Sequence, residues 1–520
     1  MEIAKKRLRI VESLSDQPTI SILLPVYNTP EHLLQRCLDS VKLQTYTKWE
    51  LCIADDASER PYVKSVIERA ARNDSRIKFV ARSDNGHISA ASNSALELAT
   101  GRFCALLDHD DELATNALLG VVQQIARTRD AEIIYSDEDK IDESGRRFDP
   151  TFKPDWSRDL FYSTNYLNHL TVIQTELIRD AGAFRIGFEG SQDYDLLLRC
   201  VERVRDDQIA HVPQILYHWR AIRGSTALER GAKSYAREST QKALAEHFER
   251  VGLVARVEPA HSGASRVSYL LNDEVPRVTL ILFGGFVSEA NEIKARWRAV
   301  THYDRIEIFN TPQSESISAS LNAAAKGATG EVICFAHSYL EPTASDWLSG
   351  LTGFAIQKEI GAVGGKIVDE DGDVQEGGEI LDPEKGVRAA YRGRPSISPG
   401  NLGRNLITGN YSSVSCQLMA IRNDVFDRLG GFDDTAFPDA LFGADLCLRL
   451  ADQRLRVVFY PHAEARFGDR RAETILSPTR AEIATFRHRW SDRLACDPFH
   501  NPNLEENSER FRHVARSQKP

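Results

Sequence analysis

The chain has 520 residues, more than one ordinary domain holds, so its length predicts two or three domains. Hydrophobic residues make up 42% and charged residues 27%, a composition that excludes disordered, collagen-like and membrane-spanning chains, and the formal charge of −10 with scattered basic residues argues against nucleic-acid binding. The N-terminal residues lack a secretory apolar segment and the eight cysteines contain no CxxC pair, so we expect a cytoplasmic protein without a zinc site.

The first part of the chain alternates between strand and helix patterns. Short apolar runs at 19–26, 49–54 and 77–81 are bounded by turn residues, and apolar residues recur with helical spacing over 30–44 and 63–73. This alternation predicts a parallel α/β sheet, in which ligand-binding residues lie at the carboxyl ends of the strands.

Two sequence patterns recur about half a chain length apart. The segment 93–101, which runs from Asn to Gly before an apolar run, returns at 322–330, and the Asp-to-Arg motif of 195–199 returns at 445–449. Similar offsets for both pairs indicate two copies of one domain and not a solenoid of short repeats.

These patterns predict five segments along the chain. They are an N-terminal extension at 1–16, a first α/β domain at 17–257, a polar linker at 258–276, a second domain at 277–485 and a charged tail at 486–520.

In the first copy, polar and acidic clusters follow the predicted strands. The segment 25–28 ends the first strand, Asp55 and Asp56 end the second, and 108–111 holds three aspartates in four residues. The aspartate pair can accept hydrogen bonds from a nucleobase or ribose, or can cap the next helix. The acidic run favours a hard divalent cation, although acidic surface turns are also common.

In this order and spacing, the motifs resemble the inverting glycosyltransferases of family 2, which have the GT-A fold. The resemblance extends to the branch that builds bacterial surface polysaccharides such as O-antigen and capsule, rhamnosyltransferases included. It covers residues 17 to 255 and rests on the segments 25–28, 55–58, 85–93, 107–111, 152–156, 165–169, 187–195 and 217–220.

The resemblance implies a role for many residues of the first copy. The nucleotide sugar would contact Pro25, Tyr27, Asn28, Asp55, Asp56, Asn85, Asn93, Asp108 and Arg220. Of these, Asp56 with Asp55 would contact base and ribose, Asp108 would lie against the nucleotide, and Arg220 would meet the phosphates.

The same resemblance assigns the metal, the general base and the acceptor contacts. Asp110 and His218 would bind Mn²⁺ or Mg²⁺, with His211 and His169 as weaker candidates. Asp193 would be the general base, and Gln192 departs from the glutamate that usually precedes it. The residues proposed for the acceptor are Lys153, Asp155, Trp156, His169 and Gln192, although Trp156 is equally typical of a core residue.

The second copy lacks these groups at the aligned positions. The first strand ends in 284–286, Gly-Gly-Phe, and the aspartate pair becomes 310–312, Asn-Thr-Pro. The acidic run becomes 337–340, His-Ser-Tyr-Leu, and Gly443 stands where the first copy has Asp193. We therefore expect a GT-A-like copy without metal-dependent transfer.

These observations favour an α/β protein of two tandem GT-A-like domains that transfers a sugar from a nucleotide sugar to a glycan, or a lipid-linked glycan, in surface polysaccharide synthesis. Attachment to the inner membrane face is compatible with such an acceptor. The alternatives are a bifunctional transferase whose second site works without metal, and a carbohydrate-binding protein with no activity. The sequence leaves the donor sugar and its nucleotide open.

Overall fold

The computed structural model describes residues 16–128, 130–221, 234–271, 274–311, 316–467 and 476–504. The chain folds into two compact units. The first unit comprises Met1–Trp156 and Asn165–Leu253, and the second unit comprises Ser157–Thr164 and Val254–Pro520. The predicted extension before residue 16 and residues 505–520 of the predicted tail lie outside the described residues.

The first unit is built on a nine-stranded sheet of order β3-β2-β1-β4-β8-β6-β9-β5, with β7 paired to β6. Strands β1 to β4 run parallel to one another, as the alternating pattern predicts, and β8 enters antiparallel between β4 and β6. The strands are β1 (Ile20–Val26), β2 (Trp49–Asp55), β3 (Ile77–Ala81), β4 (Phe103–Leu106), β5 (Glu112–Leu113), β6 (Ile133–Ile141), β7 (Arg147–Thr151), β8 (Thr171–Gln174) and β9 (Ile209–Arg220).

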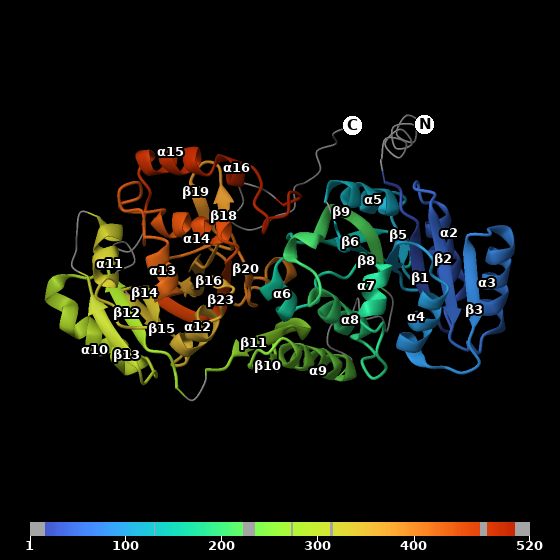
Figure 1. Cartoon of the computed structure of the whole chain (residues 1–520), viewed down its shortest axis with the longest axis horizontal. Coiled ribbons are helices and arrows are strands. Elements are labelled where there is room, and N and C mark those ends of the chain that lie inside the picture. Colours follow the sequence, from blue (N-terminus) through green and yellow to red (C-terminus); the bar gives the residue numbers. More distant parts are fainter. Residues whose placement is uncertain are drawn as a thin grey trace. The chain divides into compact units, whose positions relative to one another are not determined.

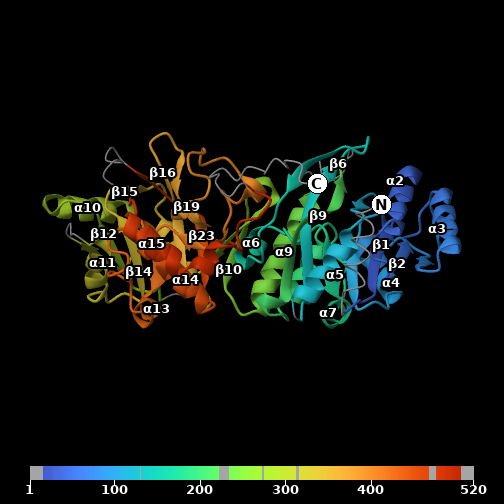
Figure 2. The ribbon, with the colours of Figure 1, turned by 90° about the horizontal axis from the view of Figure 1, so that it is seen from above.

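Helices pack on this sheet because its central strands are apolar on both faces. Every residue of β1 and β2 is buried, as in parallel strands covered by helices on two sides. Helix α4 packs on β1 and β2, and α3 packs on β3, in the blue part of Figures 1 and 2. The helices are α2 (Glu31–Lys42), α3 (Pro61–Asn73), α4 (His87–Glu97), α5 (Ala117–Arg127), α7 (Thr175–Asp180), α8 (Gln192–Val201) and α9 (Ser234–Arg250).

The second unit contains a nine-stranded sheet of order β13-β12-β14-β22-β16-β23-β15, with β17 and β20 on its side. These strands are β12 (Val278–Phe283), β13 (Ile306–Asn310), β14 (Val332–His337), β15 (Leu340–Pro342), β16 (Ile360–Val368), β17 (Val374–Glu376), β20 (Gly409–Asn410), β22 (Leu418–Arg422) and β23 (Arg456–Phe467). A separate three-stranded sheet joins β19 (Gly386–Ala389), β18 (Gly378–Asp382) and β21 (Ser413–Val414). The helices of the second unit are α6 (Arg158–Ser163), α10 (Ala290–Val300), α11 (Ile317–Ala325), α12 (Trp347–Ala355), α13 (Asn423–Arg428), α14 (Phe442–Asp452), α15 (Arg480–Arg489) and α16 (Ser491–Leu494).

The two large sheets have the same strand order once β3 is left out. The path β2-β1-β4-β8-β6-β9-β5 corresponds strand for strand to β13-β12-β14-β22-β16-β23-β15. A side-chain clamp also recurs: the amide of Asn93 exchanges two hydrogen bonds with the backbone of Phe184 (2.8 and 2.9 Å), and Asn322 does the same with Phe432 (both 2.9 Å). The repeated asparagine therefore has a structural role in both units.

The repeated Asp-to-Arg motif forms a buried ion pair in each unit. Asp195, which is 0% exposed, accepts hydrogen bonds from Arg199 and Arg185, and Arg199 also binds the backbone of the preceding loop. In the second unit Asp445 accepts from Arg449 Nε at 2.8 Å. Because its charge is compensated inside the protein, Asp195 acts on the fold and not on a ligand.

The compact units and the predicted segments differ at two places. Helix α6 lies in the second unit because buried Asp159 accepts hydrogen bonds from Asn410 Nδ2 (2.7 Å) and Arg456 Nε (2.9 Å). The predicted linker at 258–276 contains β11 (Ser265–Tyr269), which pairs with β10 (Ala255–Pro259) in a hairpin. The units divide at residues 253 and 254, slightly before the predicted boundary.

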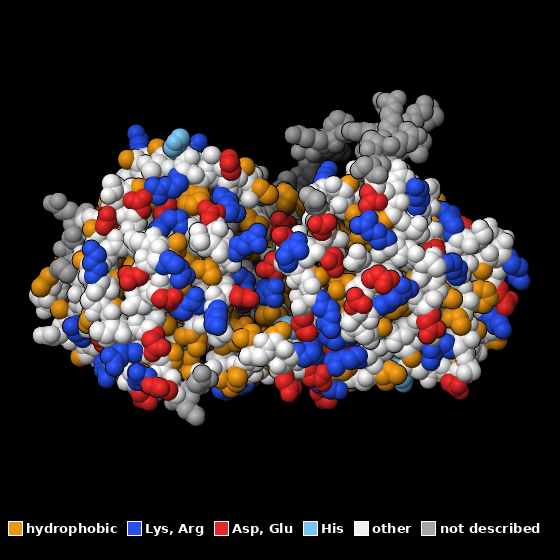
Figure 3. Space-filling view, viewed as in Figure 1, with side chains coloured by type: hydrophobic (Ala, Val, Ile, Leu, Met, Phe, Trp, Pro, Cys, Tyr) orange, Lys and Arg blue, Asp and Glu red, His pale blue; other side chains and the backbone are white. Residues whose placement is uncertain are grey.

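The surface mixes charges of both signs. On the face that Figure 3 shows, Lys and Arg side chains are interspersed with Asp and Glu. Among the residues that the structure describes, no helix combines the length and the apolar character needed to cross a bilayer.

Candidate active site

The loops that follow β1 and β2 are joined through Asn28. Its Oδ1 accepts hydrogen bonds from the backbone N–H groups of Glu59 (2.9 Å) and Arg60 (3.3 Å), and its own N–H donates to Ser58 Oγ (2.9 Å). Asn28 adopts φ +50°, a left-handed conformation that asparagine tolerates better than most residues. Its amide therefore shapes the end of β1, where the neighbouring predicted donor contacts are the buried Pro25 and the 41% exposed Tyr27.

The predicted aspartate pair lies at the carboxyl end of β2 and is almost completely buried. Asp55 Oδ1 accepts a hydrogen bond from Ser58 N (3.1 Å), and Asp56 Oδ1 accepts one from Arg82 Nε (2.8 Å). Asn85 Nδ2 donates to the backbone oxygen of Asp56 at 3.2 Å. These contacts hold together the loops after β2 and β3, which form the edge where a parallel sheet binds its ligand.

The acidic turn between β4 and β5 separates one buried aspartate from two that reach solvent. Asp111, 1% exposed, accepts hydrogen bonds from the Tyr217 hydroxyl (2.5 Å) and the Arg220 N–H (2.7 Å). Burial, with the charges of Asp110 and Asp108, raises the pKa of Asp111 well above its usual range. The side chains of Asp108 and Asp110 are 44% and 25% exposed, so these two carboxylates remain available to a ligand.

Arg220 lies inside the protein beneath this turn. Its side chain is 0% exposed, Nε donates to the backbone oxygen of Asp110 at 2.7 Å, and Nη2 forms an ion pair with Glu112. The guanidinium therefore orients the acidic turn from inside the protein. Because it is fully buried, it offers no surface to the phosphates that it was predicted to contact.

Strand β6 contributes three consecutive acidic residues that the sequence reasoning missed. Each of them pairs with a histidine from another segment: Asp137 Oδ1 with His211 Nε2 (3.0 Å), Glu138 Oε2 with His169 Nδ1 (3.1 Å), and Asp139 Oδ1 with His218 Nδ1 (2.5 Å). A detectable signal existed, because residues 137–139 follow the apolar residues 133–135 in the same way that the acidic turn follows β4.

His169 connects the β6 carboxylates to the acidic turn. Its ring stacks on Tyr217 with centroids 4.7 Å apart, and its Nε2 lies 3.7 Å from Asp108 Oδ2. Burial alone would lower the pKa of His169, but the hydrogen bond and the charge of Glu138, followed by the charge of Asp108, raise it to about 9. The imidazole is therefore a cation at neutral pH, next to a carboxylate predicted to face the nucleotide.

The His169–Glu138 pair predicts a pH-dependent contribution to stability. Because the pKa rises from the ordinary 6.5 to about 9 on folding, the contribution is complete below pH 6.5 and is lost as the pH rises through 9. We expect the ligand-free Glu138→Gln variant to melt at a lower temperature than wild type. The difference between the two melting temperatures should be largest at low pH and smallest above pH 9. Thermal melts across this range test it, with the exposed Glu143→Gln as control. A gap of constant size at every pH would contradict the pairing.

Asp193 lies in the first turn of α8, beside the acidic turn. Its Oδ2 accepts a hydrogen bond from Asn165 Nδ2 at 3.2 Å. Burial raises the pKa of Asp193, the charge of His169 opposes that rise, and the charge of Asp108 adds to it. The structure therefore brings Asp193, His169 and Asp108 into one electrostatic cluster from three distant segments of the chain.

The other predicted acceptor residues are engaged within the protein. Lys153 is 0% exposed and donates from Nζ to the backbone oxygen of His169 at 2.7 Å, so its ammonium has no exposed surface to offer an acceptor. The remaining three also have partners: Asp155 with His211 Nδ1 (3.0 Å), Trp156 Nε1 with Asp206 (2.7 Å), and Gln192 Oε1 with Gly190 N (2.8 Å).

Asp110 and His218 fit the ligand set expected for a divalent cation. His218 Nδ1 lies 2.5 Å from Asp139 Oδ1, the arrangement in which a second-sphere carboxylate orients a histidine whose other ring nitrogen binds a metal. The two residues lie at the same end of the β5–β9 pair, where Glu112 is in register with His218. The described residues contain no group of three or more metal-ligating side chains.

Residues 21–181 match the model of glycosyl transferase family 2. The first unit therefore contains a family 2 glycosyl transferase domain. The family 2 glycosyltransferase match includes Asp56, Asp108 and Asp110, and it confirms the predicted resemblance, the transferase class and the α/β fold of this part of the chain.

Two relatives align along nearly all of this chain, and a third matches a shorter part of it. An uncharacterized protein of Sinorhizobium fredii is 36% identical over 96% of this chain and 59% of its own length, and the O-antigen biosynthesis protein of Myxococcus xanthus is 31% identical over 95% of this chain and 41% of its own length. A UDP-Glc:alpha-D-GlcNAc-diphosphoundecaprenol beta-1,3-glucosyltransferase of Escherichia coli is 40% identical over 20% of this chain and 39% of its own length. The chain thus spans only about half of its two long relatives.

Proposed function

We propose that the first unit is an inverting, metal-dependent glycosyltransferase that moves a sugar from a nucleotide diphosphate sugar to a hydroxyl of a glycan. The observation that carries this proposal is the family 2 match over the segment that contains the three strand-end carboxylates Asp56, Asp108 and Asp110. Asp193 and His218 lie outside the matched residues, and we propose that they supply the general base and a metal ligand.

Asp193 is the proposed general base. An inverting transfer is a single displacement, so a carboxylate must take the proton of the acceptor hydroxyl as its oxygen attacks the anomeric carbon. A carboxylate with a raised pKa accepts that proton more readily, and Asn165 orients the Asp193 carboxylate by donating a hydrogen bond to its Oδ2. Asn165 is thus proposed as a positioning residue.

The donor would lie along the loops at the ends of β1 to β4. Asn28, Asp55 and Asp56 keep these loops in place, and the exposed carboxylate of Asp108 faces the same edge. The cationic ring of His169 lies 3.7 Å from Asp108, so it offsets part of the negative charge that a diphosphate would add there. Arg220 holds the acidic turn from below.

Asp110 and His218 are the proposed residues that would hold a divalent cation, Mn²⁺ or Mg²⁺. Such an ion supplies compensation for the charge that develops on a leaving diphosphate. Asp139 fixes the His218 ring through its hydrogen bond at 2.5 Å, and Arg220 fixes the backbone of Asp110 at 2.7 Å.

The proposed process is bacterial surface polysaccharide synthesis, with a lipid-linked glycan as acceptor and peripheral attachment at the inner membrane face. The O-antigen biosynthesis protein of Myxococcus xanthus and the Escherichia coli glucosyltransferase, whose named substrate carries a diphosphoundecaprenol, support this choice.

We propose that the second unit is a degenerate copy without transfer activity. His337 is 2% exposed at the position of the acidic run, and burial lowers its pKa to about 4, so it is neutral and has no access to a diphosphate. A Cβ atom at Gly443 would lie 2.9 Å from Cys416 Cβ, so a carboxylate cannot replace the missing base there without displacing its neighbours. A bifunctional enzyme would need a different base.

Incubation of the full chain with UDP-, dTDP- and GDP-sugars and Mn²⁺ tests the proposed function. We expect one donor to release its nucleoside diphosphate slowly in water and to raise the melting temperature, because a ligand that binds only the folded state stabilises it. If no donor is hydrolysed and none raises the melting temperature, the proposal is refuted. If the full chain forms two different linkages and the Asp193→Asn variant loses only one of them, the bifunctional alternative is favoured.

A further inference from the structure

The second unit contains a pocket that the proposed transfer reaction does not use. It has a volume of about 370 Å³, within the range of roughly 300–1,000 Å³ found for small-molecule sites. Its walls come from β18, β19, the segment after β21, the start of α14, and the residues before α15, all within one unit. Gly443 and Ala444 form the part of the wall that corresponds to Asp193 in the first unit.

One buried polar group in this pocket has no partner in the described residues. Gln417 is 3% exposed and its Oε1 makes no hydrogen bond. A buried acceptor without a donor costs about 1–3 kcal/mol of stability, so such groups are rare unless a ligand completes them. Gln417 therefore presents to the pocket a hydrogen-bond acceptor for which the described residues supply no donor.

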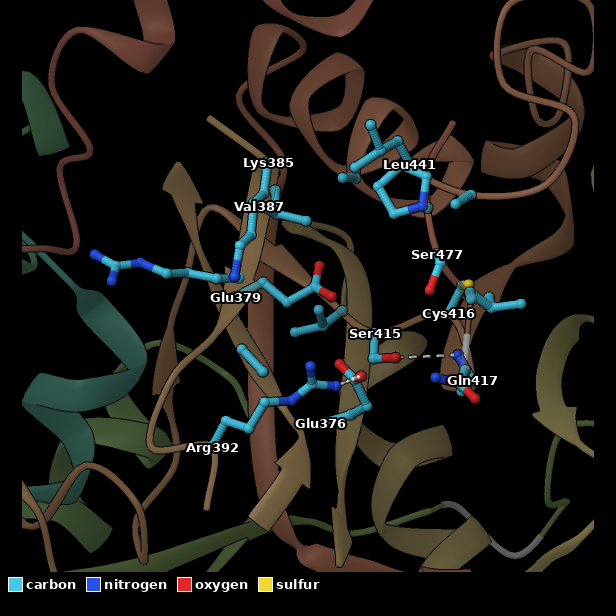
Figure 4. A pocket seen from close by; sticks show the side chains of 18 of the residues that line it. Glu376, Glu379, Lys385, Val387, Arg392, Ser415, Cys416, Gln417, Leu441 and Ser477 are labelled. Carbon is cyan, nitrogen blue, oxygen red and sulfur yellow. Dashed lines mark hydrogen bonds and ion pairs between the residues drawn. The ribbon is translucent and has the colours of Figure 1, made fainter. Parts of the chain in front are cut away.

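A second acceptor points into the same space. Oε2 of Glu379 accepts a hydrogen bond from Ser413 Oγ at 2.5 Å, and in Figure 4 the carboxyl group of Glu379 points into the space between Lys385 and Leu441. Burial, with the charge of Glu376, raises the pKa of Glu379 to about 8. At neutral pH this side chain is mostly a neutral acid, which can both donate and accept a hydrogen bond.

One ion pair lies in the pocket wall, and other parts of the wall are apolar. Glu376 Oε1 lies 2.5 Å from Arg392 Nη2, so this pair does not demand a charged ligand. Val387, Val414 and Leu441 supply apolar surface. Hydroxyl donors on one side of a ligand and C–H groups on the other would match these walls, and a pyranose ring carries both.

We propose that this pocket binds one pyranose residue of a glycan, so that the second unit acts as a glycan-binding module. The bound sugar would donate a hydroxyl hydrogen to Gln417 Oε1 and exchange hydrogen bonds with Glu379, with its apolar face toward Leu441. The inference does not depend on whether the first unit transfers sugar.

Saturation-transfer NMR on the full chain with a panel of methyl pyranosides tests this inference. Individual sugars bind weakly, so a dissociation constant on the order of 1 mM is expected for at least one of them. Gln417→Met should weaken binding at least tenfold and should keep or raise the melting temperature, by about 2–4 °C, because it removes an unsatisfied buried acceptor. Val387→Phe should also abolish binding by filling the pocket.

The matched control is Gln453→Met, the same substitution at an exposed position of the same unit, which should bind like wild type. Binding should also persist in Asp193→Asn and in excess nucleoside diphosphate, which separates this site from the transfer reaction. Absence of saturation transfer from every pyranoside, or a signal that both pocket variants leave unchanged, would overturn the proposal.

Discussion

Asp193→Asn is expected to lower sugar transfer by at least about 10²-fold while donor affinity stays nearly unchanged, because an amide cannot take the acceptor proton. The substitution keeps the shape of the side chain and its place in α8. Initial rates of transfer and equilibrium binding of the donor, measured on the same preparation, separate lost chemistry from lost binding.

Asp180→Asn is a matched control, since Asp180 is an exposed carboxylate at the end of α7. Its transfer rate should equal that of wild type. If Asp193→Asn retained the wild-type rate, the base assignment would be wrong. Asp195 would not be its substitute, because that carboxylate is 0% exposed and paired with Arg199 and Arg185.

Removal of divalent cations with EDTA is expected to abolish transfer, and Mn²⁺ or Mg²⁺ is expected to restore it. His218→Ala and Asp110→Ala should each weaken metal-dependent nucleotide binding together with turnover, because each would remove one of two protein ligands. Asp139→Asn should weaken metal affinity by about 10- to 100-fold, the usual effect of losing the partner that orients a ligand. Calorimetric titration with Mn²⁺ and nucleotide measures these losses.

His32→Ala provides the control for this series, since His32 is exposed on α2. It should bind metal and nucleotide as wild type does. Full activity in chelator would remove the cation from the mechanism, whereas loss of activity in His218→Ala with unchanged metal affinity would assign His218 another role.

The sequence contained enough information for the strands of the first sheet, because buried parallel strands are short apolar runs that end in turn residues. The strands predicted at 19–26, 49–54 and 77–81 appear as β1, β2 and β3 with ends that differ by one residue at most. The aspartate pair at the end of β2 was found for the same reason. The repeated motifs were recognisable because Asn93 and Asn322 make the same backbone contacts in both units.

Tertiary structure alone decided which of the predicted residues a ligand can reach. The sequence by itself established the α/β pattern and the acidic strand ends, and it predicted the repeat, because each of these patterns is made by residues close together in the chain. The pairing of His218 with Asp139, the burial of Arg220 and Lys153, and the pocket around Gln417 depend on segments that are distant in sequence and meet only after folding. Local sequence carries no record of such contacts, because burial and hydrogen bonding are properties of the packed chain.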